Sequence, residues 1–178
     1  MDWKAPLPAH IAPFAAWMAA MVILPETAWA YAVRSALTAA LLLWLRPWRG
    51  YGKPAGRHFP LALAAGVAVF ALWVLPESGW MRAHFPLLAS WYGKIGIIGD
   101  KPLPEVLPYA PETAGWPLTV VHLAGSAFVI AVAEEFFWRG FIYRWLIARE
   151  FMKVDLRRLD GQMLLIGSLV FGFEHDRW

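Results

Sequence analysis

The stretch PLTVVHLAGSAFVIAVAEEFFWRGFIYRWLI, residues 117–147, decides the fold class of this chain. It begins with Pro117, a residue that suits the first turn of a helix, and it stays largely apolar to its end. A bilayer core about 30 Å thick requires about 20 apolar residues, each adding about 1.5 Å to a helix. This stretch is therefore predicted to be a helix that spans a membrane.

The composition of the whole chain agrees with a membrane location. Apolar residues make up 60% of the 178 residues, charged residues make up 16%, and the chain contains 12 Trp. Soluble domains carry about 25% charged residues, and Trp favours the interface between membrane and water. The chain has no cysteine, which excludes a disulfide framework, a thiolate nucleophile and a metal site built on Cys.

Four further apolar stretches complete the expected fold, which is all-α: a polytopic membrane bundle of about five transmembrane helices. They cover residues 11–24, 28–45, 60–75 and 162–178. The first two are separated only by Pro25, Glu26 and Thr27, so they are predicted to form a tight helical hairpin. Residues 1–116 are expected to hold the N-terminal transmembrane helices and an extracytoplasmic loop.

The basic residues predict the orientation of the chain. Residues 46–60 contain four bases and no acid, and residues 139–158 contain six bases and two acids. Lys and Arg accumulate in cytoplasmic loops, so we expect a multi-pass protein of the cell (inner) membrane with a cytoplasmic N-terminus. The bases lie between apolar runs and not along one soluble face, which argues against a nucleic-acid partner. A cleavable signal peptide ending near residue 30 is the alternative for the N-terminus.

Two adjacent carboxylates lie inside the longest apolar stretch. Ionisable groups in a membrane helix are costly, so Glu134 and Glu135 are functional candidates. Glu135 and Arg139 are four residues apart and share a helix face, so they are predicted to pair. Glu134 is rotated by about 100° from that face, and it is the candidate general base that takes a proton from water.

His175 is the predicted partner of Glu134, as a general acid or base or as a metal ligand. Glu134 lies fifteen residues before Arg149, about 22 Å along a helix, and His175 lies thirteen residues after Gln162, about 20 Å. The two groups are therefore expected at similar depth. Both are candidate ligands of a divalent metal, although a catalytic zinc site normally has three protein ligands.

Purely structural interpretations of these residues are also consistent with the sequence. The glutamates and Arg139 could mark the solvated cytoplasmic end of a helix, and residues 174–177 could form an interfacial polar end. His122 lies twelve residues before Glu134, about 18 Å along the helix, so it cannot share that site. The other histidines are expected in loops or at segment ends: His10, His58 and His84.

Two motifs resemble a known family. The Glu134-Glu135-x-x-x-Arg139 pattern resembles the first signature of the CPBP family, the intramembrane proteases of the CAAX-processing and bacteriocin-processing type. Phe171-Gly172-Phe173-Glu174-His175 is similar to the second signature, Phe-x-x-x-His. The residues of both motifs are most similar to those of the CAAX-protease-related group that accompanies exosortase systems. The resemblance implies a partial CAAX-protease-like core over residues 117–178.

The resemblance implies an intramembrane endopeptidase in which Glu134 activates water, His175 helps to hold it and Arg139 orients the glutamates. The implied substrate is a peptide or a prenylated protein. The resemblance also implies an exosortase-type sorting system as a partner. The family carries another His, followed four residues later by Asn or His, on a further helix. That helix would lie beyond Trp178, so the chain is expected to be C-terminally truncated and inactive alone. A non-enzymatic proton or ion pathway, or an immunity-type binding protein, is the alternative function.

Overall fold

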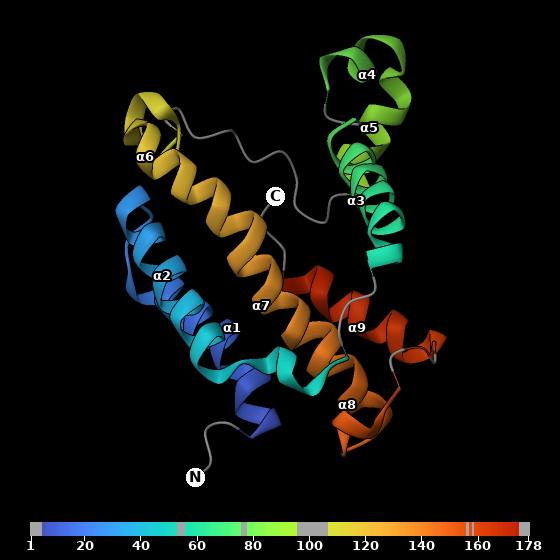
Figure 1. Ribbon diagram of the computed structural model, residues 1–178. Coiled ribbons are helices and arrows are strands. Elements are labelled where there is room, and N and C mark those ends of the chain that lie inside the picture. Colours follow the sequence, from blue (N-terminus) through green and yellow to red (C-terminus); the bar gives the residue numbers. More distant parts are fainter. Residues whose placement is uncertain are drawn as a thin grey trace. The chain divides into compact units, whose positions relative to one another are not determined.

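The computed structural model describes residues 5–52, 56–75, 78–95, 107–155, 157 and 159–174. None of these residues lies in a β-strand, and most of them are helical (Figure 1). The all-α class predicted from the apolar stretches is confirmed. The chain divides into two compact units, Met1–Tyr51 with Pro104–Glu174 and Gly52–Leu103 with His175–Trp178, which are described separately below.

The first unit begins with the predicted helical hairpin. Helix α1 spans Pro6–Ile23 and helix α2 spans Ala28–Leu45. Thr27 caps α2, because its Oγ1 accepts a hydrogen bond from the backbone N–H of Ala30 at 3.4 Å. Helix α2 ends at Arg46, which adopts a left-handed conformation with φ of 53°. A short 3-10 turn, η1 (Pro47–Gly50), follows.

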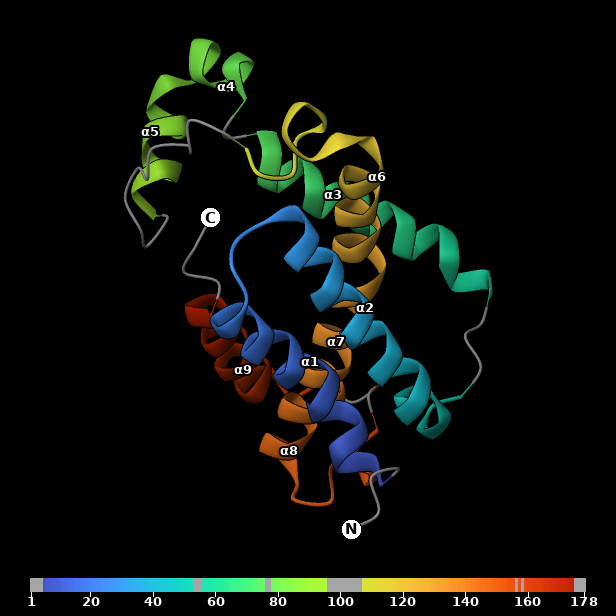
Figure 2. The same ribbon diagram turned by 90° about the vertical axis from the view of Figure 1, so that its left-hand side faces the viewer.

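A long helix from residue 111 to residue 147 crosses the first unit (Figure 2). It kinks at Gly115, whose φ of 76° a glycine adopts without steric cost. Its α-helical parts are α6 (Pro111–Ala124), α7 (Ala131–Glu135) and α8 (Arg144–Ile147). The two parts between them, η4 (Gly125–Ile130) and η5 (Phe136–Tyr143), are π-helical. Such widened turns are rare and occur frequently at functional sites.

The hairpin packs against this long helix. Phe14 of α1, Leu42 of α2 and Ala133 of α7 form a buried apolar cluster. Nearer the start of α2, Gly125 permits a close approach, since a Cβ atom there would lie 2.5 Å from Ser35 Oγ and 2.8 Å from Tyr31 Cε1. A small residue at a helix contact allows two backbones to come together.

Helix α2 also buries polar side chains inside the unit. Arg34 and Ser35 are each 5% exposed, and Thr38 is fully buried. The guanidinium of Arg34 lies 5.6 Å from the ring centroid of Trp17 and 5.7 Å from that of Tyr31, and aromatic faces attract such a cation. Within the described ranges no carboxylate forms an ion pair with Arg34.

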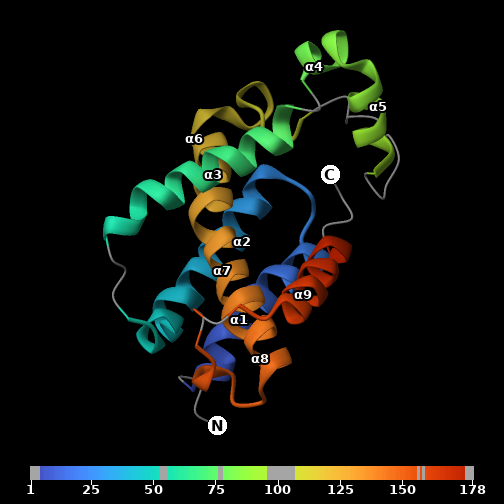
Figure 3. The ribbon, with the colours of Figure 1, turned by 90° about the vertical axis from the view of Figure 1, so that its right-hand side faces the viewer.

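Helix α9 (Gly161–Glu174) returns beside the long helix (Figure 3). Asp160 begins it, because its Oδ1 accepts hydrogen bonds from the backbone N–H groups of Gln162 and Met163, each at 3.1 Å. The backbone N–H of Asp160 in turn donates to the hydroxyl of Tyr143 at 2.9 Å. The connection between the two helices is therefore tied to η5.

The second unit contains more helix than the sequence predicts. Its first long helix is α3 (Phe59–Val74). Residues 1–116 are expected to include an extracytoplasmic loop, and after α3 the structure has two short helices, α4 (Gly79–His84) and α5 (Pro86–Ile95). Ser78 caps α4 by accepting a hydrogen bond from the backbone N–H of Met81 at 3.2 Å.

Three described stretches are long and apolar enough to cross a membrane: Pro6–Ile23, Ala28–Gly50 and Pro111–Ile147. The two other predicted segments are apolar helices of shorter length, Gly56–Leu72 and Gly161–Gly172. Large apolar side chains face outward on these helices, as a bilayer requires. Val22 of α1 is 88% exposed and Leu43 of α2 is 64% exposed. The chain is a membrane protein.

Candidate functional site

The two glutamates lie where the long helix changes its winding. Glu134 and Glu135 are the last residues of α7, and the π-helical segment η5 begins at the next residue, Phe136. The preceding residue, Ala133, is 1% exposed and contacts the apolar cluster formed with α1 and α2. The packing of Ala133 thus fixes the point in the bundle at which the carboxylates emerge.

Glu135 and Arg139 form the predicted ion pair. Nη1 of Arg139 donates to Oε1 of Glu135 at 2.8 Å and to Oε2 at 2.6 Å. The side chains are 73% exposed for Arg139 and 55% exposed for Glu135. The i, i+4 spacing predicts this contact, and the structure confirms the pairing; the catalytic roles of both residues stay a prediction.

Glu134 is partly buried, while Glu135 beside it is exposed. The adjacent carboxylates therefore differ in environment, as their rotation around a helix predicts. His175 and the side chain of Glu174 lie outside the described residues. The predicted approach of Glu134 to His175, in a catalytic or metal-binding pair, therefore stays a prediction.

Aromatic rings surround the segment that follows the glutamates. The ring of Phe137 stacks on Phe14 of α1, with 4.6 Å between centroids. The indole of Trp138 meets Phe14 at 6.3 Å and meets Phe171 of α9 at 5.6 Å, in both cases edge to face. Phe171 opens the second motif and Trp138 lies inside the first. The structure thus brings α9 and the glutamate-bearing helix together through residues of the two motifs.

A buried polar network lies against η5 at Gly140. Nε2 of His10 lies 2.8 Å from the hydroxyl of Tyr51, and Nδ1 of His10 lies 2.6 Å from the carbonyl oxygen of Pro6. Nη1 of Arg144 donates to the same Tyr51 hydroxyl at 3.4 Å. Burial raises the pKa of the Tyr51 hydroxyl, while the charge of Arg144 opposes this rise, so the hydroxyl stays protonated at neutral pH.

The sequence interpretation missed this network. His10 is predicted to lie in a loop or at a segment end, but it belongs to α1 and is 1% exposed. Gly140 makes the contact possible, since a Cβ atom there would lie 2.7 Å from the Tyr51 hydroxyl and 3.0 Å from Cδ2 of His10. The glycine that directly follows Arg139 is the one local signal of this close approach.

His122 takes part in a separate aromatic cluster. Its ring stacks on Tyr109, with 4.1 Å between centroids, and lies 4.4 Å from the ring of Tyr31. The hydroxyl of Tyr31 lies 2.6 Å from Oγ of Ser126. The prediction that His122 stands apart from the glutamates agrees with these partners, all of which lie on other parts of the bundle.

The described residues do not provide a three-ligand metal site. In the part of the chain that the structure describes, no group of three or more His, Asp or Glu side chains could hold a metal ion. Glu134 and His175 would supply two ligands at most.

Comparison with known proteins bears on the same helices. Residues 116–177, about a third of the chain, match the family model of type II CAAX prenyl endopeptidases, described as Rce1-like. No curated protein and no solved structure matches the chain. The matched segment contains Glu134, Glu135, Arg139 and Phe171. Over residues 116–177 this chain therefore matches the Rce1-like type II CAAX prenyl endopeptidase family, which is consistent with the CPBP proteases that its motifs resemble.

Proposed function

We propose that this protein is an intramembrane endopeptidase of the CAAX-processing type. The observation that carries the proposal is the position of Glu134 and Glu135 in an apolar helix long enough to cross a membrane, within the segment that matches the family. Carboxylates at such a position cost free energy, so those that occur there are candidates for a function. The contact of Phe171 with Trp138 supports a site that both motifs share.

In the proposed reaction Glu134 acts as the general base. Its carboxylate accepts a proton from water, and the water oxygen attacks the carbonyl carbon of the scissile peptide bond. The C–N bond then breaks, and the proton passes to the nitrogen of the leaving amine. His175 holds the water or stabilises the charge on the carbonyl oxygen. Arg139 holds Glu135 in place through the two hydrogen bonds that its Nη1 donates.

The substrate class and setting belong to the same proposal. The substrate is a membrane peptide or a prenylated protein, and the enzyme lies in the cell (inner) membrane with its N-terminus and both basic loops in the cytoplasm. Association with an exosortase-type sorting system is a proposed partnership. A divalent metal such as zinc remains an expectation of the family resemblance, with Glu134 and His175 as the residues that would contact it.

Proteolysis of a tagged membrane substrate tests the proposal. Wild-type protein and the variants Glu134→Gln and Glu134→Ala are reconstituted with the same substrate, and cleavage is followed by gel. Under conditions in which the wild-type protein cleaves the substrate, we expect no cleavage by either variant. Cleavage that persists in Glu134→Gln, which keeps the shape and loses the base, would reject the assigned role.

A proton or ion pathway is the second candidate. Arg34, Arg144 and His10 are each at most 5% exposed inside the first unit, and buried ionisable residues in membrane helices also mark such pathways. Proton flux into vesicles, measured with a pH-sensitive dye, distinguishes the two functions. Flux that depends on Arg34, without any proteolysis, would favour the pathway.

A further inference from the structure

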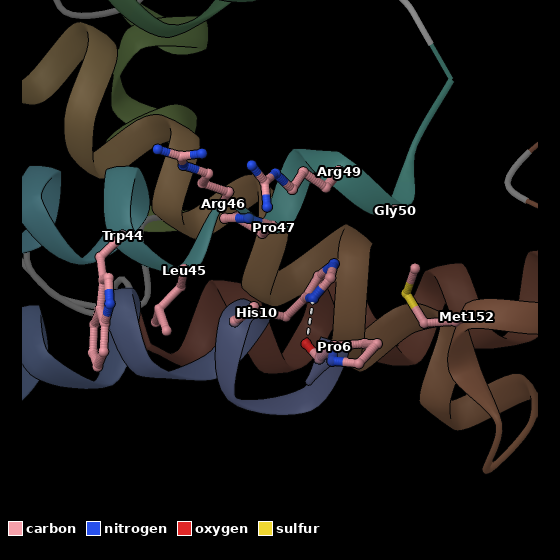
Figure 4. Close-up of a pocket in the computed structure, with 10 residues that line it drawn as sticks. Pro6, His10, Trp44, Leu45, Arg46, Pro47, Arg49, Gly50 and Met152 are labelled. Atoms are coloured by element: carbon pink, nitrogen blue, oxygen red, sulfur yellow. Dashed lines mark hydrogen bonds between the residues drawn. The ribbon is translucent and has the colours of Figure 1, made fainter. Parts of the chain in front are cut away.

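A basic pocket lies where the first two candidate spans end. It is formed by the start of α1, the end of α2, the turn η1 and Met152 (Figure 4). Its lining includes Arg46 and Arg49, with His10 facing them from α1. The candidate spans begin at Pro6 and end at Gly50, and both of these residues line the pocket. A bilayer spanned by these two stretches would therefore have one of its surfaces near the pocket.

Among the described residues, no ion pair neutralises the positive charge around this pocket. Three described acids pair with bases that do not line the pocket: Glu135 with Arg139, Glu150 with Lys153, and Asp155 with Arg157. Across the described ranges neither Arg46 nor Arg49 takes part in an ion pair. Nε of Arg46 donates to the carbonyl oxygen of Leu43 at 3.0 Å. That bond leaves the terminal nitrogens of Arg46 as donors for a ligand.

A third arginine adds charge behind the pocket wall. Arg144 is 4% exposed, and its Nη1 lies 3.7 Å from Sδ of Met152, which lines the pocket. Its Nε has no hydrogen-bond partner among the described residues. A buried guanidinium without a carboxylate partner favours an anion nearby. The first turn of α1, with no side-chain cap at its start, adds the positive end of a helix dipole at Pro6.

Backbone strain at Arg46 is an independent sign that the side chain matters. Its φ of 53° places it in the left-handed region, which is sterically unfavourable for a residue with a Cβ atom. Glycine is the usual residue where a helix ends in this conformation. A strained residue of this kind is a reason to look for a function of its side chain.

We propose that this pocket binds the phosphate of an anionic phospholipid headgroup, with Arg46 and Arg49 as its ligands. Arginine forks match phosphate oxygens, and basic pockets between membrane helices at the cytoplasmic side bind such headgroups. The apolar surface beside the pocket favours a lipid over free phosphate. Leu43 is 64% exposed and Trp44, a lining residue, is 54% exposed, so acyl chains have a surface to follow. The proposal is independent of proteolysis.

Lipid binding by the purified full chain tests the proposal. The protein is titrated with phosphatidylglycerol and separately with phosphatidylcholine in detergent, and bound lipid is counted by native mass spectrometry. We expect phosphatidylglycerol to bind in preference, and we expect Arg46→Gln/Arg49→Gln to weaken that binding about 30-fold, since each basic residue near a membrane surface contributes about a factor of five or six. The control Arg57→Gln/Arg82→Gln removes two charges from residues that do not line the pocket, and it should bind as the wild type does.

Two further measurements separate lipid binding from misfolding and from binding of a soluble anion. Arg46→Gly suits the left-handed backbone, so it should fold at least as well as the wild type and still bind less phosphatidylglycerol. Inorganic phosphate at millimolar concentration should not displace the lipid. Equal binding of both lipids, an equal loss in the control variant, or unchanged binding in Arg46→Gln/Arg49→Gln would overturn the proposal. Displacement by inorganic phosphate would assign the site to a soluble anion and would overturn the lipid assignment.

Discussion

The ring of Phe171 meets the indole of Trp138 edge to face, with 5.6 Å between their centroids. Glu134 lies four residues before Trp138, and His175 lies four residues after Phe171. From this contact we expect antiparallel helices to carry Glu134 and His175 at the same level, about 6 Å along each axis from the two rings. This relationship adds a structural reason to the expected pairing of the two polar residues.

Disulfide cross-linking measures that pairing directly. The chain contains no cysteine, so Glu134→Cys/His175→Cys introduces the sole thiol pair. We expect rapid disulfide formation under mild oxidation, because a disulfide requires Cα atoms within about 7 Å. The cross-link is measured on a gel after the chain is cut at a protease site engineered between the Glu134-bearing helix and α9. Cross-linked fragments stay together and migrate as one band. The control pair Glu135→Cys/His175→Cys should cross-link more slowly, since Glu135 lies on another face, and equal rates would contradict the proposed geometry.

Gly140→Ala should destabilise the protein by about 1–3 kcal/mol, the usual cost of excess volume in a packed interior. The new methyl group would lie 2.7 Å from the Tyr51 hydroxyl. Tyr51→Phe removes that oxygen, so the double variant should recover part of the loss. Thermal unfolding in detergent, followed by circular dichroism, measures both effects. Gly167→Ala is the matched control, because a Cβ atom there has no neighbour within 4 Å; a similar loss in that variant would show that the effect is not local.

Glu135→Gln and Arg139→Gln should each change the free energy of unfolding by less than about 1 kcal/mol. Both side chains are more than half exposed, and exposed ion pairs contribute little to stability. If the pair orients the glutamates, cleavage of a membrane substrate should fall in both variants while the unfolding curve stays in place. A large shift of the unfolding midpoint would instead show that the pair is a structural element.

Reporter fusions test the proposed orientation. A fusion at Lys53 should report the cytoplasm and a fusion at Lys101 should report the opposite side, because the first lies in the stretch with four bases and no acid. Alkaline phosphatase and green fluorescent protein at each position supply complementary signals. Both positions on one side of the membrane would contradict the expected topology.

Local patterns in the sequence predict much of the fold. The apolar runs at 11–24, 28–45 and 117–147 coincide with helices long enough to span a membrane. The spacing of Glu135 and Arg139 predicts their ion pair. These successes concern residues a few positions apart on one helix, where the period of 3.6 residues fixes the relationship.

The features that the sequence does not predict depend on contacts between distant residues or on the winding of a helix. His10, Tyr51 and Arg144 meet through tertiary packing, and no periodic pattern joins positions so far apart in the chain. The π-helical segments have no apolar period that separates them from ordinary helix. Helices α4 and α5 were obscured by the Pro and Gly content of their stretch, although Ser78 as a cap and Pro86 at a first turn are start signals.

The π-helical segment η5 makes this part of the chain sensitive to length. A π-helix holds more residues per turn than an α-helix, so deleting one residue from 136–143 would let the segment return to regular α-helical winding. Every later side chain would then turn relative to Glu134, and Arg144 would move away from the hydroxyl of Tyr51. Substitutions can be absorbed between the glutamates and Arg144, but the number of residues between them is itself a structural constraint.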